Sequence, residues 1–133
     1  EEGARLITLL GSAGTGKTRL SIQYGNNQLR DYPGGVWFCD LTEARSVSGI
    51  CKTVAGSLNI GVRSGNPIES LADSLRERGH CLLILDNFEQ ISEFAHETVG
   101  YWLRESPTTH IIVTSRERLG VEGENIFFVD FSV

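Results

Sequence analysis

Short apolar runs alternate along the chain with stretches in which apolar residues recur every three or four positions. The runs are residues 6–10 (LITLL), 36–39 (VWFC), 81–85 (CLLIL), 110–114 (HIIVT) and 126–129 (IFFV). Uninterrupted apolar runs of this length predict strands that are buried on both faces. Strands that alternate with helical patterns are typical of an α/β fold with a largely parallel sheet.

The stretches between the runs predict helices. We expect them over about residues 17–30, 47–58, 67–78 and 91–103. The third helix has the clearest end signals, because Asn66 suits an N-cap, Pro67 the first helical position and Gly79 a C-cap. These strands and helices account for nearly the whole chain, so we expect a single domain over residues 1–133.

The charge and composition of the chain exclude several classes of function. The formal net charge is -5, from 12 Lys+Arg against 17 Asp+Glu. This balance argues against a broad surface for nucleic acid or anionic lipid, although it allows a local cationic pocket for phosphate. No apolar run approaches the roughly 20 residues that span a bilayer, and no signal peptide is visible. We therefore expect a cytoplasmic domain that binds neither nucleic acid nor a membrane.

The cysteines and histidines do not have the spacing of metal ligands. Cys39, Cys51 and Cys81 are odd in number and far apart, which favours free thiols over disulfides. The histidines at positions 80, 96 and 110 are also isolated, so we interpret them as residues at the ends of helices or strands.

The strongest chemical signal follows the first apolar run. The loop Gly11-Ser12-Ala13-Gly14-Thr15-Gly16-Lys17-Thr18 matches the pattern G-x-x-x-x-G-K-[ST]. Glycines allow such a loop to turn its N–H groups toward one anion, and the following helix presents its positive end to that anion. We expect the loop and the adjacent Arg19 to bind nucleotide phosphates. Lys17 would reach the β- and γ-phosphates, and the hydroxyl of Thr18 would bind Mg²⁺.

Two other predicted strands end in residues that suit a nucleotide site. Asp86 follows the run at 81–85, and the carboxyl ends of parallel strands are where ligands of such sheets bind. We expect Asp86 to hold Mg²⁺, through water. Arg116 follows the run at 110–114 and would emerge at the same edge, within reach of a γ-phosphate. From composition alone, a surface arginine is the simpler interpretation of Arg116.

Four segments together resemble a known family. In chain order they are GSAGTGKT, GVWFCDL, LLILDNFEQ and IIVTSRERLGVEGE. They resemble the STAND ATPases (signal-transduction ATPases with numerous domains), and especially the NB-ARC-like module of bacterial multidomain transcriptional regulators and signalling ATPases. The resemblance implies a three-layer P-loop NTPase fold with a five-stranded parallel sheet in the order 5-1-4-3-2. It also implies that Lys17 and Thr18 are Walker A residues, Asp86 the Walker B acid and Arg116 a sensor of the γ-phosphate.

The sequence departs from this family at several places. The segment that helps to hold adenine, the helical lid and the winged helix would lie outside residues 1–133, so we interpret the chain as a fragment. Asn87 stands after Asp86, where many relatives have a second acid. Glu89 is a candidate substitute for that acid, and the alternative interpretation of Glu89 is a charge at a helix N-terminus.

The resulting hypothesis is an ATP/ADP-binding switch module with slow Mg²⁺-dependent hydrolysis, a weak ATPase within a signalling or transcription-regulating protein. Its expected partners are the nucleotide, the other domains of the parent chain and, in the full-length protein, a second copy that associates in a nucleotide-dependent way. A P-loop kinase or motor-type ATPase, or a scaffold that holds nucleotide without hydrolysing it, stays open as an alternative. The residues do not distinguish ATP from GTP.

Overall fold

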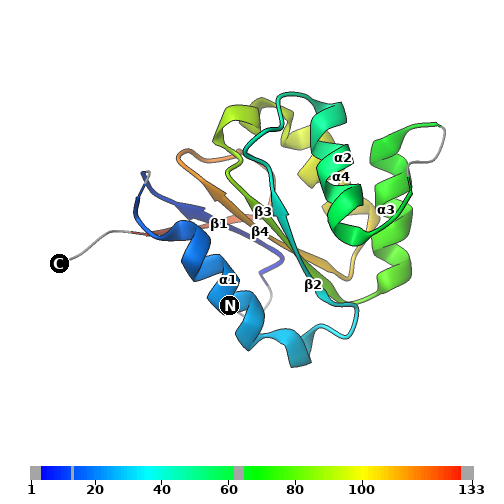
Figure 1. The fold of residues 1–133 in the computed structure, drawn as a ribbon, viewed down its shortest axis with the longest axis horizontal. Coiled ribbons are helices and arrows are strands. Elements are labelled where there is room, and N and C mark those ends of the chain that lie inside the picture. Colours follow the sequence, from blue (N-terminus) through cyan, green and yellow to red (C-terminus); the bar gives the residue numbers. More distant parts are fainter. Residues whose placement is uncertain (1–3, 13, 62–64, 130–133) are drawn as a thin grey trace.

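The computed structural model describes residues 4–12, 14–61 and 65–129, which are organised around one parallel sheet. Its strands are β1 (Leu6–Leu10), β2 (Val36–Asp40), β3 (Cys81–Asp86), β4 (Thr109–Ser115) and β5 (Glu124–Phe128). They lie in the order β2-β3-β4-β1-β5, and every neighbouring pair is parallel (Figure 1). This is the predicted order 5-1-4-3-2 counted from the other edge, so the predicted fold class is confirmed.

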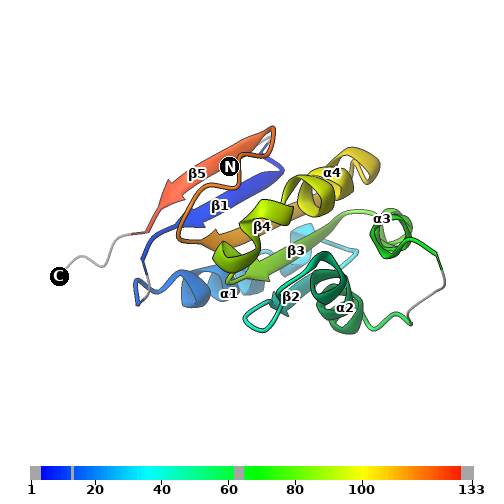
Figure 2. The same ribbon diagram turned by 90° about the horizontal axis from the view of Figure 1, so that it is seen from above.

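Helices cover both faces of the sheet. They are α1 (Lys17–Asn27), α2 (Val47–Leu58), α3 (Pro67–Arg78) and α4 (Tyr101–Glu105). The view from above shows α1 on one face and α2, α3 and α4 on the other, which gives the expected three layers (Figure 2). The predicted caps of α3 are confirmed, since the Asn66 side chain accepts a hydrogen bond from the Ile68 N–H and Gly79 has a φ of 75°.

The central strand β3 shows why the apolar runs form strands. All of its residues are buried. Leu83 and Leu85 pack in the core beneath α2, α3 and α4, while Leu82 and Ile84 pack in the smaller core on the other face, with Tyr24 of α1. A residue in such a strand is covered whichever face it points to, so no polar alternation is required.

The three cysteines are buried free thiols, as predicted. Burial raises the pKa of Cys39 to about 11, so its thiol stays protonated near neutral pH. Within the described residues, no group of three or more His, Cys, Asp or Glu side chains could hold a metal ion. In the same parts of the chain, no helix has the length and hydropathy to cross a membrane.

Two predicted elements, the first helix and the last strand, were wrong in their bounds by two or more residues. The first helix ends at Asn27 instead of near residue 30, and a separate 3-10 helix follows over Leu29–Asp31. The last strand begins at Glu124, two residues before the predicted start, and ends at Phe128. Glu124 belongs to the strand because it pairs in register with Leu6, and its carboxylate accepts a hydrogen bond from the Thr8 hydroxyl at 2.7 Å.

The prediction of one regular fourth helix over about residues 91–103 was wrong. The segment consists of a 3-10 helix (Glu89–Phe94), a π-helical turn (His96–Gly100) and the short α4. Ile91, with φ of -125° and ψ of 19°, breaks the helical backbone inside the first piece. The apolar stripe itself is buried, as expected, because Ile91 and Trp102 are both fully covered.

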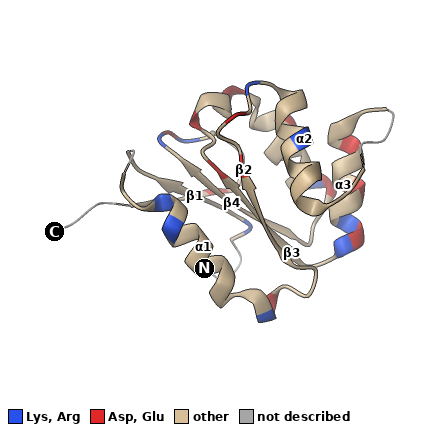
Figure 3. Cartoon of the chain, in the orientation of Figure 1, with Lys and Arg blue, Asp and Glu red and all other residues tan. Residues whose placement is uncertain are grey.

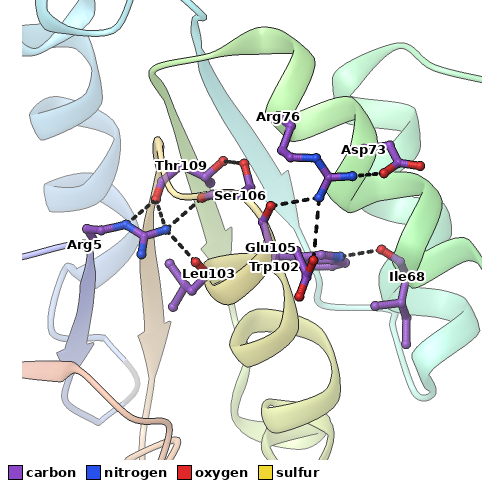
Figure 4. Close-up of polar contacts among 9 residues, drawn as sticks. All are labelled: Arg5, Ile68, Asp73, Arg76, Trp102, Leu103, Glu105, Ser106 and Thr109. Atoms are coloured by element: carbon purple, nitrogen blue, oxygen red, sulfur yellow. Dashed lines mark hydrogen bonds and ion pairs between the residues drawn. The ribbon is translucent and has the colours of Figure 1, made fainter.

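Side chains from other elements hold α4 in place (Figure 4). One guanidinium nitrogen of Arg5, Nη2, lies 2.8 Å from the carbonyl oxygens of both Leu103 and Ser106, at the end of the helix where carbonyls lack helical partners. The indole N–H of Trp102 donates to the carbonyl of Ile68 at 2.9 Å, which joins α4 to α3.

Candidate functional site

The loop between β1 and α1 has the backbone that the glycine pattern predicts. Gly14 and Gly16 have φ of 82° and 90°, in the region of positive φ that residues with a Cβ seldom adopt. A Cβ on Gly11 would lie 2.7 Å from the carbonyl oxygen of Val129, so a larger residue does not fit there. Ala13 was also predicted to belong to this loop, and it lies outside the described residues.

A cavity of about 760 Å³ opens over this loop, within the size range of small-molecule sites. It brings together residues from three separate segments of the sequence. They are Gly14, Thr15, Gly16, Lys17, Thr18, Arg19 and Ile22 from the loop and α1, Asn87 and Glu89 from the segment after β3, and Arg116 from the segment after β4. The predicted residues from Gly14 to Arg19 therefore share one cavity with the candidates Glu89 and Arg116, whereas Gly11, Ser12 and Asp86 are not among its lining residues.

Lys17 is folded back onto the loop. Its ammonium donates to the carbonyl oxygens of Gly11 and Ser12, at 2.7 and 2.9 Å. The Thr15 hydroxyl donates to the same Ser12 carbonyl at 2.9 Å. These contacts hold a positive charge at the mouth of the loop, where an anion would have to bind.

Asp86 lies at the end of β3 and is only 2% exposed. The Thr18 hydroxyl, in the first turn of α1, lies 3.0 and 2.9 Å from the two oxygens of the Asp86 carboxylate. Because β4 lies between β1 and β3, the Thr114 hydroxyl also reaches this carboxylate, at 2.6 Å from Oδ1. Carboxylate and hydroxyl oxygens suit Mg²⁺, so the residues present fit this ion.

Asn87 and two residues from the end of β2 extend this network. The Asn87 amide nitrogen lies 3.2 Å from Asp86 Oδ2 and 2.8 Å from the Thr42 hydroxyl. Thr42 in turn donates to Asp40 Oδ1 at 2.6 Å. Hydrogen bonds from Thr42 hold the pKa of Asp40 below its usual value. No role in the site was predicted for Thr42, Asp40 or Thr114, since only the pairing of neighbouring strands reveals their proximity.

Glu89 and Arg116 line the cavity without being fixed by the protein. Glu89 Oε1 is buried and has no hydrogen-bond partner among the described residues. The Arg116 side chain is exposed, and within those parts of the chain it forms no salt bridge. Basic residues also stand at the start of α1, and the acidic residues Asp40 and Asp86 stand at the ends of β2 and β3 (Figure 3). The lining of the cavity itself combines the basic residues Lys17, Arg19 and Arg116 with the acidic Glu89.

Comparison with protein families decides the class of this site. A model of the AAA domain matches residues 1–120. The chain belongs to the AAA domain family. Nucleotide binding, usually with Mg²⁺, is the property that this family implies.

Relatives of this AAA domain are much longer proteins. An uncharacterized protein of Mycobacterium tuberculosis is 31% identical over 121 residues, which cover 90% of this chain and 30% of that protein. A second protein of the same organism, named as an HTH-type transcriptional regulator, is 36% identical over 124 residues, covering 90% of this chain and 13% of the regulator. The AAA domain chain therefore spans less than a third of either relative.

Solved structures share the fold of this AAA domain. Cdc6p from Pyrobaculum aerophilum has a TM-score of 0.68 at 20% identity, over 93% of this chain and 38% of Cdc6p. A Signal Transduction ATPase with Numerous Domains from Pyrococcus horikoshii, with a tetratricopeptide repeat sensor, has a TM-score of 0.63 at 19% identity, over 93% and 20% of the two chains. These similarities show the shared fold, and the family match confirms the predicted P-loop ATPase class.

Proposed function

We propose that this AAA domain is an ATP/ADP-binding switch module with slow Mg²⁺-dependent ATP hydrolysis. The observation that carries the proposal is the contact between Thr18 and Asp86, with 2.9 Å between the hydroxyl and the nearer carboxylate oxygen. It joins the first turn of α1 to the end of β3. The two side chains expected to hold Mg²⁺ are therefore already together, beside the loop expected to hold the phosphates.

The phosphate-binding residues come from the loop and from α1. Phosphates would lie on the backbone N–H groups of residues 11–18, at the positive end of the helix. Lys17 would leave its two carbonyl partners for the β- and γ-phosphates, because an anion is a stronger partner for an ammonium group. Arg19 lines the same cavity and would add to its positive potential. When bound, Mg²⁺ would neutralise charge that develops on the transferred phosphoryl group.

Glu89 is our candidate for the base in hydrolysis. Glu89 lines the cavity, and its buried Oε1 has no hydrogen-bond partner among the described residues. Its carboxylate could accept the proton of a water that attacks the γ-phosphorus. The bond from the γ-phosphorus to the leaving oxygen breaks as the bond to the water oxygen forms, and ADP and phosphate result. Slow turnover suits a switch, because the nucleotide state must outlast the signal that it reports.

Arg116 is our candidate for the group that distinguishes ATP from ADP. Its guanidinium is free of salt bridges to the described residues, and it lines the cavity together with Lys17. A guanidinium at this place could form charge-assisted hydrogen bonds with a γ-phosphate, which ADP lacks. The ATP-bound and ADP-bound states of the switch would then differ in whether Arg116 binds a phosphate.

We further propose that residues 1–133 form one NB-ARC-like nucleotide-binding domain of a longer protein. The lengths of the relatives support this, because most of each relative lies outside the matched region. The missing adenine-binding segment, helical lid and winged helix would belong to that remainder. Partners would then be the nucleotide, the other domains of the parent chain and a second copy of the full-length protein, in a cytoplasmic setting. The regulator name of one relative favours a role in transcription control.

The strand order bears on the main alternative. In a P-loop kinase the phosphate-loop strand and the Walker B strand usually lie side by side, whereas here β4 lies between β1 and β3. This order disfavours a kinase. A scaffold that binds nucleotide without hydrolysing it has the same strand order, so the two must be separated by measuring hydrolysis.

Single-turnover release of phosphate from Mg·ATP, together with binding of ATP and ADP, tests the proposal. We expect slow release of phosphate by the parent chain. In Asp86→Asn, phosphate release and nucleotide binding should no longer depend on Mg²⁺. Lys17→Ala should weaken the binding of ATP and of ADP together, since Lys17 would contact a phosphate that both nucleotides contain. Glu89→Gln should bind normally and release phosphate roughly 10²–10⁴-fold more slowly.

Glu93→Gln is the matched control for Glu89→Gln. It changes an exposed glutamate in the same 3-10 helix and should behave like the parent. No phosphate release by the parent chain would favour the scaffold. Unchanged nucleotide binding by Lys17→Ala would place the phosphate site elsewhere and contradict the proposal as a whole.

A further inference from the structure

The side chain of Asn87 faces two oxygen atoms that can each accept a hydrogen bond from it. Its amide nitrogen lies 3.2 Å from Asp86 Oδ2 and 2.8 Å from the Thr42 hydroxyl oxygen. The hydrogen of that hydroxyl is already used, because Thr42 donates it to Asp40 Oδ1 at 2.6 Å. An amide offers two N–H bonds and satisfies both oxygens, whereas a carboxylate in the same place would meet only acceptors.

The backbone of Asn87 is tied to the other oxygen of Asp86. Its N–H donates to the Thr114 hydroxyl at 2.9 Å, and that hydroxyl donates to Asp86 Oδ1 at 2.6 Å. This arrangement requires the left-handed backbone, with a φ of 64° at Asn87, a region in which asparagine is among the few side chains found. One residue thus supports both oxygens of the buried carboxylate, directly on one side and through Thr114 on the other.

We propose that Asn87 is a positioning residue, which orients the Asp86 carboxylate for Mg²⁺ and links it to the end of β2. The inference rests on the proposed role of Asp86 in holding Mg²⁺. It gives a physical reason for an amide at the position where the STAND resemblance implies a second acid. At this place an amide donates to two oxygens of the network around Asp86, and the acid that could serve as base enters the cavity two residues later, at Glu89.

Loss of the amide should weaken the binding of Mg²⁺ and leave the phosphate cradle intact. Groups that hydrogen-bond to a metal ligand typically alter metal affinity by roughly 10–100-fold when they are removed. In the described residues, Asn87 forms no hydrogen bond to the phosphate loop, so nucleotide binding without metal should not depend on it. A purely structural role would instead lower thermal stability and weaken binding with and without metal.

The test measures ADP binding over a range of Mg²⁺ concentrations and in the presence of EDTA. Asn87→Gly removes the amide and keeps the backbone free to adopt a positive φ. Thr42→Val removes the outer partner of Asn87, together with the bond from Thr42 to Asp40, and leaves the contact between Asn87 and Asp86, so its effect should have the same direction and be smaller. Asn59→Gly is the matched control, because Asn59 also has a positive φ, of 60°, at the end of α2.

We expect Asn87→Gly to raise, about 10–100-fold, the Mg²⁺ concentration that gives half of the maximal change in ADP affinity. Its ADP affinity in EDTA and its thermal midpoint should be close to those of Asn59→Gly. Parent-like Mg²⁺ dependence in Asn87→Gly overturns the inference, provided that Asp86→Asn has lost its Mg²⁺ dependence. If Asp86→Asn also keeps the parent's Mg²⁺ dependence, the proposed magnesium site itself is wrong and the inference falls with it. Equal loss of ADP affinity with and without metal would assign Asn87 a structural role only.

Discussion

Lys17 and Arg116 carry the same charge into one cavity, but the protein holds them differently. Lys17 donates two hydrogen bonds to the loop that it belongs to, whereas Arg116 is exposed and makes no salt bridge within the described residues. The ammonium of Lys17, held at the loop, suits the β-phosphate, which ATP and ADP both contain. The guanidinium of Arg116, without fixed partners, suits the γ-phosphate, which is present only in the ATP state.

Arg116→Ala should therefore lower the affinity for ATP and leave that for ADP nearly unchanged. Hydrogen bonds to charged groups contribute about 1.5–3 kcal/mol each, which corresponds to roughly tenfold to more than a hundredfold in affinity. Titration of the parent and the variant with ADP and with a non-hydrolysable ATP analogue, both with Mg²⁺, measures the ratio. The ratio is informative even if parts of an adenine pocket lie outside this chain, because both nucleotides lose the same contacts.

Arg118→Ala is the control for this substitution. Arg118 is also exposed, two positions further along the same segment, and does not line the cavity. An ATP to ADP ratio that changes equally in both variants would mean that general positive charge, and not a specific contact of Arg116, favours ATP.

At the scale of single residues, the sequence predicted most of the site that a local pattern can encode. The phosphate loop has a fixed spacing within one segment, so Gly14, Gly16 and Lys17 could be assigned directly. Thr42 could not, because its role depends on Asn87, 45 positions away. A side chain whose function arises from a neighbouring strand has no signature in its own segment.

Among the elements, α4 depends on a side chain from outside it. Arg5 uses its guanidinium to bind the carbonyls of Leu103, Ser106 and Thr109 at the end of the helix, with distances of 2.8 to 3.2 Å. Burial lowers the pKa of Arg5, but the guanidinium remains charged at neutral pH. Its fork of N–H groups reaches several carbonyls that a single ammonium group cannot bind together.

We expect Arg5→Lys to destabilise the protein by about 1–3 kcal/mol, since buried carbonyl oxygens would lose their donors. Chemical denaturation, followed by circular dichroism, gives the free energy of unfolding. Arg104→Lys is a suitable comparison, because Arg104 is exposed on α4 itself and should change stability by less than about 0.5 kcal/mol. Equal stability of Arg5→Lys and the parent would show that water replaces the guanidinium at these carbonyls.

The segment from Glu89 to Glu105 shows how far a periodic pattern predicts an element. Apolar residues at spacings of three and four correctly identified the buried side of this segment. The same spacings are compatible with 3-10, α and π turns, and the segment contains all of these. Packing against the sheet and α3 selects among these turns. One example is the hydrogen bond from the Trp102 indole to the Ile68 carbonyl, whose acceptor lies outside the segment.

At the scale of the whole molecule, the alternation of apolar runs with helical patterns predicted the fold class, while the strand order needed the family resemblance. Each run predicts a buried strand but does not reveal its neighbours. Short connections restrict the possibilities, because parallel strands are joined by right-handed crossovers, but several orders still satisfy that rule. The order found places β4 between β1 and β3, and this alone brings Thr114 to Asp86.

The pairing of β1 makes a further prediction for the intact fold. Leu6 pairs with Ile111 of β4 and with Glu124 of β5, so the strand before the phosphate loop is completed by the last two strands of the chain. A chain that stops at residue 108 should therefore fail to protect the β1 amides from hydrogen exchange, whereas one that stops at 129 should protect them. Protection of β1 in the shorter chain would show that β1 is stabilised without its partner strands.

The same pairing has a consequence during synthesis on the ribosome. The strand before the phosphate loop is made about a hundred residues before its partner strands, which corresponds to roughly 5–20 s of translation. For that interval the apolar residues of β1 have no sheet to join and are available to chaperones. The capacity to bind nucleotide should thus arise late and abruptly, when β4 and β5 leave the exit tunnel.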